Sequence, residues 1–162
     1  MAATIVLKPI RKKQKSLKSK GTAASIKIRV FLVDDHPVVR YGLAESLERA
    51  GDMAVCGEAG NAEQALELLR DCQVDVISVD LTLGKRSGID LIRDIRFLNP
   101  EVALVVYTMC QDISVLESAL RAGARVCIQK VDTTDKLIEA IRGMMKKSSV
   151  KGDNSEESGE EF

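Results

Sequence analysis

Five polar residues that could share one chemical site each stand directly after an apolar stretch of the chain. Asp34 and Asp35 follow the first stretch, Asp80 the third, Thr108 the fourth and Lys130 the fifth. If these stretches form parallel strands, the residues that follow them meet at the carboxyl edge of the sheet. We therefore expect the five side chains to lie together.

The three aspartates are suited to a divalent cation. Carboxylates packed together raise one another's pKa unless a cation neutralises them, and Mg²⁺ accepts oxygen ligands from a small number of protein groups. One carboxylate could then act as a nucleophile toward a phosphoryl group and form an acyl phosphate. Lys130 would supply positive charge to the transferred oxygens, and the hydroxyl of Thr108 would supply a hydrogen-bond donor.

A purely local role is the alternative for each of these residues. The acidic pair could cap the following helix, Asp80 could end a strand, and Lys130 could be solvated. Five such residues would then coincide at one edge by chance. We favour a shared site for that reason.

The elements that must position these residues alternate between two kinds of pattern. Short runs rich in β-branched residues predict five strands: Ile28–Val33, Met53–Glu58, Val74–Val79, Val102–Tyr107 and Val126–Gln129. Stretches of helical period between them predict five helices: Pro37–Ala50, Asn61–Arg70, Gly88–Leu98, Asp112–Ala122 and Thr133–Lys147. The apolar stripes of these helices are interpreted as core.

This alternation predicts an α/β fold. The strands are mostly continuous apolar runs, as expected where helices cover both faces of a parallel sheet. We expect a doubly wound five-stranded parallel sheet in the flavodoxin-like order 2-1-3-4-5, which makes the first and third strands neighbours.

Charge divides the chain into three parts. Residues 1–27 contain eight Lys and Arg and no acid, residues 28–145 contain thirteen basic and nineteen acidic residues, and residues 146–162 contain three Lys and five acids. We expect a basic, disordered arm over 1–27 and a polar, acidic, disordered tail over 148–162. The arm could contact nucleic acid, an acidic partner or anionic lipid, and a solvated tail is the favoured interpretation.

Composition limits the classes of protein. Apolar residues make up 45% of the chain and charged residues 30%, and no apolar run reaches the length that crosses a bilayer. Without a signal-peptide pattern, a cytoplasmic location is expected. Cys56, Cys72, Cys110 and Cys127 show no metal-binding spacing and are expected to be buried, reduced thiols.

The predicted domain, residues 28–147, resembles the receiver domain of bacterial response regulators. The matching segments are Val30–Pro37 (VFLVDDHP), Val76–Asp80 (VISVD), Gly88, Tyr107–Thr108, Ala119–Ala124 (ALRAGA) and Lys130. The Asp-Asp-His-Pro start and the Cys56–Ala59 segment are most similar to the receiver half of LuxR-type transcription regulators.

The resemblance implies a role for each site residue. Asp80 would be the phosphoacceptor, and Mg²⁺ would be held by Asp34, Asp35, Asp80 and the backbone carbonyl of Thr82. Thr108 and Lys130 would read the phosphoryl group and shift an existing conformational equilibrium. The protein would then be a phosphoacceptor that assists its own phosphorylation and dephosphorylation, and not an enzyme acting on other substrates.

The resemblance also implies partners. Phosphate would come from a sensor histidine kinase, a phosphotransfer protein or a small phosphodonor, and not from the single His36. Homodimers could form through the face built from the 112–122 helix, the 126–129 strand and the 133–147 helix, or through the first and last helices. LuxR-type regulators continue into a helix-turn-helix domain, and we expect no recognisable DNA-binding domain in residues 148–162. The chain could be a single-domain receiver or a piece of a larger factor.

Two other functions compete with the phosphorylation switch. Cys127 stands where an aromatic residue usually changes rotamer in receivers, which leaves open a pseudo-receiver that binds partners without phosphorylation. A Mg²⁺ phosphatase with an aspartyl nucleophile would need a general acid two residues after Asp80, and Thr82 cannot serve as one.

Overall fold

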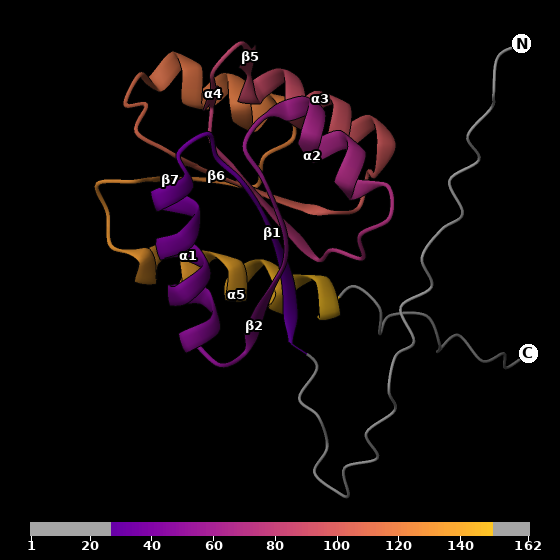
Figure 1. Ribbon diagram of the computed structural model, residues 1–162, viewed down its shortest axis with the longest axis vertical. Helices are drawn as coiled ribbons and strands as arrows, with labels where there is room; N and C mark the ends of the chain where they lie inside the picture. The colour runs from indigo at the N-terminus through magenta and orange to yellow at the C-terminus, as the bar shows by residue number, and fades with distance from the viewer. Residues whose placement is uncertain (1–26, 151–162) are drawn as a thin grey trace, which may run out of the picture.

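Five strands form one parallel sheet in the predicted order. The computed structural model describes residues 27–150, with the side chains of 147–150 left out, and the predicted arm and tail lie almost entirely outside that range. The strands are β1 (Ile28–Val33), β2 (Met53–Ala59), β3 (Val76–Val79), β6 (Ala103–Thr108) and β7 (Val126–Gln129). Their order is β2-β1-β3-β6-β7 and all pairings are parallel, which confirms the 2-1-3-4-5 topology (Figure 1).

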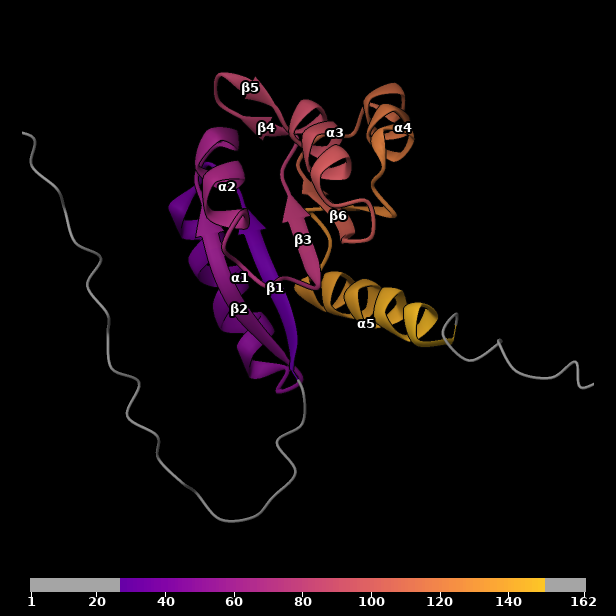
Figure 2. The same ribbon diagram turned by 90° about the vertical axis from the view of Figure 1, so that its right-hand side faces the viewer.

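Helices cover both faces of the sheet. They are α1 (Pro37–Arg49), α2 (Ala62–Leu69), α3 (Gly88–Leu98), α4 (Ile113–Ala122) and α5 (Thr134–Val150). α1 and α5 pack on one face, and α2, α3 and α4 pack on the other (Figure 2). Of the helices in the described range, none is both long and apolar enough to span a membrane.

Alternating side chains of the strands build two cores. Phe31 and Val33 of β1 face α2, α3 and α4, whereas Val30 and Leu32 face α1 and α5. The two-residue period of a strand directs neighbouring side chains to opposite faces, and both faces are covered here. The strands are therefore mostly apolar, as the sequence indicated, and the exceptions include Arg29 of β1 and Glu58 of β2.

A short hairpin beside the sheet was not predicted. β4 (Thr82–Leu83) pairs antiparallel with β5 (Arg86–Ser87), and Gly84 in the turn between them has a φ of +67°. Glycine adopts this left-handed conformation without a steric penalty. Two-residue strands are too short to show a period in the sequence, so the pattern analysis missed them.

Several element boundaries differ from prediction. β3 begins at Val76 and not at Val74. Just before it, the backbone N–H of Asp75 donates to the carbonyl of Arg29, and the carboxylate of Asp75 accepts from the backbone N–H of Arg29, where a strand would use its own backbone. We expected Thr108 to follow the fourth strand, but it is the last residue of β6. The helix caps were predicted well: the side chain of Asn61 accepts a hydrogen bond from the backbone of Gln64 at the start of α2.

The cysteines are less buried than predicted. All four thiols are free, Cys56 is exposed, and the other three are partly buried. The prediction for Cys56 was wrong because it assumed that every residue of an apolar run faces a core.

Candidate metal and phosphoacceptor site

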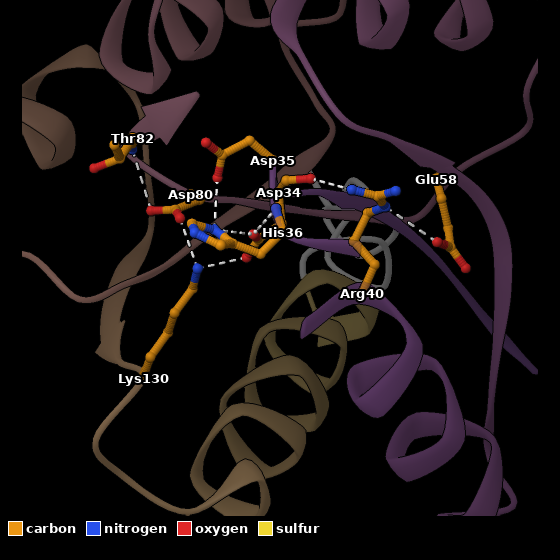
Figure 3. A network of polar contacts seen from close by, with 8 residues as sticks. All are labelled: Asp34, Asp35, His36, Arg40, Glu58, Asp80, Thr82 and Lys130. Carbon is orange, nitrogen blue, oxygen red and sulfur yellow. Dashed lines mark hydrogen bonds and ion pairs between the residues drawn. The ribbon is translucent and has the colours of Figure 1, made fainter. Parts of the chain in front are cut away.

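The ends of β1 and β3 bring Asp34 and Asp80 side by side. The backbone N–H of Asp80 donates to the carbonyl of Val33 at 2.9 Å, so the ladder between the two strands continues to their carboxyl ends. The side chains of Asp34 and Asp80 are only 3% and 4% exposed. The neighbouring strand order that the sequence predicted therefore places two buried carboxylates together (Figure 3).

Four residues form a cluster that could hold a cation. Ligand atoms of Asp34, Asp35, His36 and Asp80 all lie within 4.8 Å of one another. His36 extends this group beyond the predicted residues: its Nδ1 lies 2.7 Å from Oδ1 of Asp35, and its side chain is 64% exposed. The sequence signal for His36 was its place beside the acidic pair, which alone could not separate a cluster member from a helix cap.

One carboxylate oxygen of the cluster lacks a hydrogen bond. Oδ1 of Asp35 is buried and has no hydrogen-bond partner, even though the imidazole lies near it. A buried anionic oxygen without a donor is costly to desolvate. A divalent cation would remove that cost, and oxygen ligands of this kind are the ones that Mg²⁺ accepts. The residues present therefore fit Mg²⁺.

Lys130 follows β7 and joins the two buried aspartates. Its Nζ lies 2.5 Å from Oδ2 of Asp34 and 2.6 Å from Oδ2 of Asp80. Burial alone would lower the pKa of Lys130, but hydrogen bonds to the two carboxylates and their negative charges outweigh burial and raise it. One ammonium thus contacts two carboxylates, and the carboxylate of Asp35 lies in the same cluster, so carboxylates outnumber the ammonium at this site.

The loop after Asp80 shapes the acceptor side of the site. The backbone N–H of Thr82 donates to Oδ1 of Asp80 at 3.2 Å, whereas its carbonyl as a metal ligand stays a prediction. Gly88 packs against the same loop: a Cβ built on it would lie 2.1 Å from the carbonyl oxygen of Asp80. Only glycine permits this approach.

Thr108 lies at the same edge of the sheet and is joined to Lys130 by a backbone hydrogen bond. The N–H of Lys130 donates to the carbonyl of Thr108 at 2.8 Å, and Thr108 is fully buried. Its hydroxyl accepts a hydrogen bond from the backbone of Cys110 at 3.2 Å. A link between this hydroxyl and the acceptor carboxylate remains a prediction.

Arg40 is a neighbour of the site that the sequence did not indicate. Its Nη1 donates to the carbonyl oxygen of Asp34 at 2.6 Å, and its Nε pairs with Glu58 of β2 at 3.3 Å (Figure 3). This arginine fixes the backbone of the acidic pair from α1. Arg40 stands three residues after Pro37 in a helix with other charged residues, so its position in the sequence did not mark it as a neighbour of the site.

A protein-family comparison matches this arrangement. Residues 30–142 match the family model described as the response regulator receiver domain. The chain belongs to this receiver family. That assignment agrees with the resemblance seen in the sequence, and the matched range includes the acidic edge of the sheet.

Similar proteins and structures support the receiver assignment. The transcriptional regulatory protein YxjL of Bacillus subtilis is 35% identical over 116 residues, covering 72% of this chain and 53% of that protein, so the chain spans about half of the relative's length. A crystal structure of a LuxR-family two-component response regulator from Aurantimonas sp. SI85-9A1 is 34% identical with a TM-score of 0.71, covering 74% of this chain and 86% of that one.

A third relative carries a modified residue. The crystal structure of a response regulator protein from Burkholderia pseudomallei is 28% identical with a TM-score of 0.67, covering 78% of this receiver and 74% of that chain. That structure is described as having a phosphorylated aspartic acid, a calcium ion and citrate.

Proposed function

We propose that this receiver accepts a phosphoryl group on Asp80 from a phosphohistidine of a sensor histidine kinase or phosphotransfer protein, in a Mg²⁺-dependent reaction, and thereby switches partner binding in the cytoplasm. The main support is the buried Asp80 carboxylate, which is held at one oxygen by Lys130 and at the other by the N–H of Thr82. The phosphorylated aspartic acid of the Burkholderia relative supports the same assignment.

The chemistry follows from what surrounds the carboxylate. An oxygen of Asp80 forms a bond to phosphorus while the bond to the donor imidazole breaks and its electron pair leaves with the nitrogen. Mg²⁺, held by Asp34, Asp35, Asp80 and the carbonyl of Thr82, would offset negative charge on the transferred oxygens. Lys130 is close enough to both buried aspartates to move its ammonium onto the phosphoryl group once it arrives.

The expected output is a change of surface and not turnover of an external substrate. Thr108 and Lys130 are adjacent through their backbones, and β6 and β7 continue into α4 and α5. Reorientation of either side chain would therefore act on the face of α4, β7 and α5, where Ile113 and Leu120 of α4 are exposed. This face, or the face of α1 and α5, could bind a second receiver or another partner.

A phosphorylation-independent interaction module is the second candidate. Cys127 of β7 favours it, because its partly buried thiol donates to the carbonyl of Leu116 in α4 at 3.8 Å and cannot swing as a large ring would. The two candidates differ in one respect: only the first needs Asp80 to accept phosphate.

Intact mass after treatment with acetyl phosphate separates the two. We expect one phosphate-sized mass gain with Mg²⁺, little without it, and none in Asp80→Asn. The matched control is Asp71→Asn, which changes an exposed aspartate after α2 and should leave the gain unchanged. The adduct should be stable in acid and labile in base. A gain that persists in Asp80→Asn would overturn the assignment, and no gain in the wild type would favour the second candidate.

A further inference from the structure

The edge strand β2 contains an irregularity at Cys56. Val30 of β1 pairs with Val55, but the next residue, Phe31, pairs with Gly57, which leaves Cys56 as an extra residue. Such a β-bulge redirects a side chain and bends the strand locally. β2 is at the edge of the sheet, and Cys56 is exposed there.

Gly57 explains why the bulge lies at this position. A Cβ on Gly57 would lie 2.5 Å from Cε2 of Phe31, so the ring of Phe31 occupies the space that a side chain would need. The ring is 1% exposed and belongs to the core under α2 and α3. Packing of this ring thus requires a glycine opposite Phe31 in the pairing of β1 with β2, and the neighbouring Cys56 has no partner residue in β1.

Cys72 lies beside Cys56 although sixteen positions separate them in the chain. Its thiol is 3.8 Å from the carbonyl oxygen of Cys56 and 3.9 Å from that of Gln73. Cys72 also contributes to the raised pKa of the Cys56 thiol, after desolvation by burial. The end of α2 therefore brings a second thiol to the bulge.

A cation lies near both thiols. Arg29 of β1 is bound to Asp75 and Gln73, and it interacts electrostatically with Cys56 and with Cys72. Arg29 opposes the rise in the pKa of Cys56, although desolvation and Cys72 outweigh it. The thiolate is the reactive form in thiol–disulfide exchange. Two adjacent thiols beside a cation on an exposed edge are the parts of a dithiol that can be oxidised.

We propose that Cys56 and Cys72 form a reversible disulfide bond when the receiver meets a low-molecular-weight disulfide such as oxidised glutathione. This inference is independent of the proposed phosphorylation, because neither cysteine contacts the acidic site. The bond would join the edge strand β2 to the segment that precedes β3.

The exchange takes two balanced steps. The Cys72 thiolate attacks one sulfur of glutathione disulfide, the S–S bond breaks, and the first glutathione thiolate leaves with the electron pair and takes up the proton that Cys72 released. The Cys56 thiolate then attacks the sulfur of Cys72, and the second glutathione leaves in the same way with the proton from Cys56. The two cysteines lose two electrons, and the glutathione disulfide gains them.

The order of attack follows from the surroundings of Cys56. Desolvation of the thiol, together with the hydrogen bond and charge of Cys72, raises the pKa of Cys56 to about 12. Cys56 is therefore protonated at neutral pH and is the slower first nucleophile. Once Cys72 is in a mixed disulfide, its charge no longer opposes ionisation of Cys56, so the second step becomes easier.

The other two cysteines provide an internal control. The thiol of Cys127 is directed to the carbonyl of Leu116, and burial, with a smaller effect from Cys110, raises its pKa. Neither of these residues lies on a bulge at the sheet edge. We expect both to remain reduced under conditions that oxidise Cys56 and Cys72.

Alkylation of the protein after exposure to oxidised glutathione tests the proposal. Reduced protein should take up four alkyl groups, one for each cysteine, whereas the oxidised protein should take up two and regain four after dithiothreitol. Trypsin cuts after Arg49, Arg70 and Lys85, so the bond should appear as one cross-linked pair of peptides, 50–70 with 71–85.

Variants assign the two steps. Cys56→Ser should stop at a glutathione adduct on Cys72, Cys72→Ser should react several-fold more slowly, and Cys110→Ser should still form the bond. Uptake of four alkyl groups after oxidation would overturn the proposal, as would a cross-link of peptides 97–121 and 126–130. Dimers joined through Cys56 would also overturn it. Phosphate uptake by Cys56→Ser should equal that of the wild type, which keeps this test separate from that of the proposed function.

Discussion

Charge is balanced in different ways at the two ends of the parallel strands, the amino edge where the strands begin and the carboxyl edge where they end. At the amino edge, Asp75 is paired with Arg29 at 2.8 Å and Asp52 with Arg142 at 2.7 Å, so each carboxylate has its own guanidinium. These ion pairs are partly exposed. Hydrogen bonds from the arginines lower the pKa of both aspartates.

At the carboxyl edge the balance is incomplete. Lys130 contacts Asp34 and Asp80, which are both almost fully buried, and an oxygen of Asp35 in the same cluster has no hydrogen bond. A carboxylate with its own guanidinium stabilises the fold and needs no added cation. Charge left unbalanced in a buried position marks where an external cation and a phosphoryl group would be accommodated.

The largest expected difference between the edges concerns their cations. Lys130→Met removes the ammonium that contacts both buried aspartates, and we expect a loss of about 3 kcal/mol in the free energy of unfolding, since breaking a buried ion pair leaves charge uncompensated. Arg29→Met, the matched change at the amino edge, should cost much less, because its ion pair with Asp75 is partly exposed and screened by solvent. Urea unfolding in the presence of a chelator measures both. Equal losses would contradict the comparison.

The second largest effect concerns the close packing of Gly88 against the backbone of Asp80. Gly88→Ala places a Cβ 2.1 Å from the carbonyl oxygen of Asp80 and 2.7 Å from Cα of Leu81, so the backbone must move. We expect destabilisation of about 2 kcal/mol, as is usual for overpacking, together with reduced phosphate uptake. Gly42→Ala in α1 has open space around it and should stabilise by up to about 1 kcal/mol. Unchanged phosphate uptake in Gly88→Ala would remove this loop from the site.

Neutralising one aspartate at each edge should have opposite effects on stability. Asp35→Asn removes excess negative charge, and in a chelator we expect it to stabilise the fold by about 1 kcal/mol. Asp75→Asn removes a paired charge and should destabilise by about 1 kcal/mol or less. Thermal unfolding with and without Mg²⁺ gives both values, and Mg²⁺ should stabilise the wild type more than Asp35→Asn. Shifts of the same sign in a chelator would show that the edges do not differ.

The smallest effect is the pH dependence of the amino edge. Hydrogen bonds from Arg29 lower the pKa of Asp75 in the folded chain below the unfolded value of about 3.9. Its contribution to stability is therefore complete above about pH 4 and is lost as the pH falls through the lower folded value. The stability gap between wild type and Asp75→Asn should be constant from pH 7 to about 5 and should shrink below about 4. Urea unfolding across that range checks it, and a gap that persists at about pH 3 would exclude the ionised carboxylate as its source.

Local sequence patterns determined the frame of this protein. Runs of β-branched residues and stretches of helical period predicted the five main strands and five helices, because side-chain periodicity is a property of neighbouring residues. The same pattern placed Asp34, Asp80 and Lys130 at one edge, since the ends of parallel strands meet there whatever the details of packing. The receiver family was inferred from the resemblance of motifs such as VFLVDDHP and VISVD, and the expected strand order agreed with that resemblance.

Only the tertiary structure decided how the residues at that edge share charge and which thiols meet. The sharing of Lys130 between two aspartates, the support from Arg40 and the pairing of Cys56 with Cys72 depend on segments far apart in the chain. The exposure of Cys56 depends on a bulge set by the ring of Phe31. Such contacts come from packing between elements, and a periodic pattern within one element does not specify them.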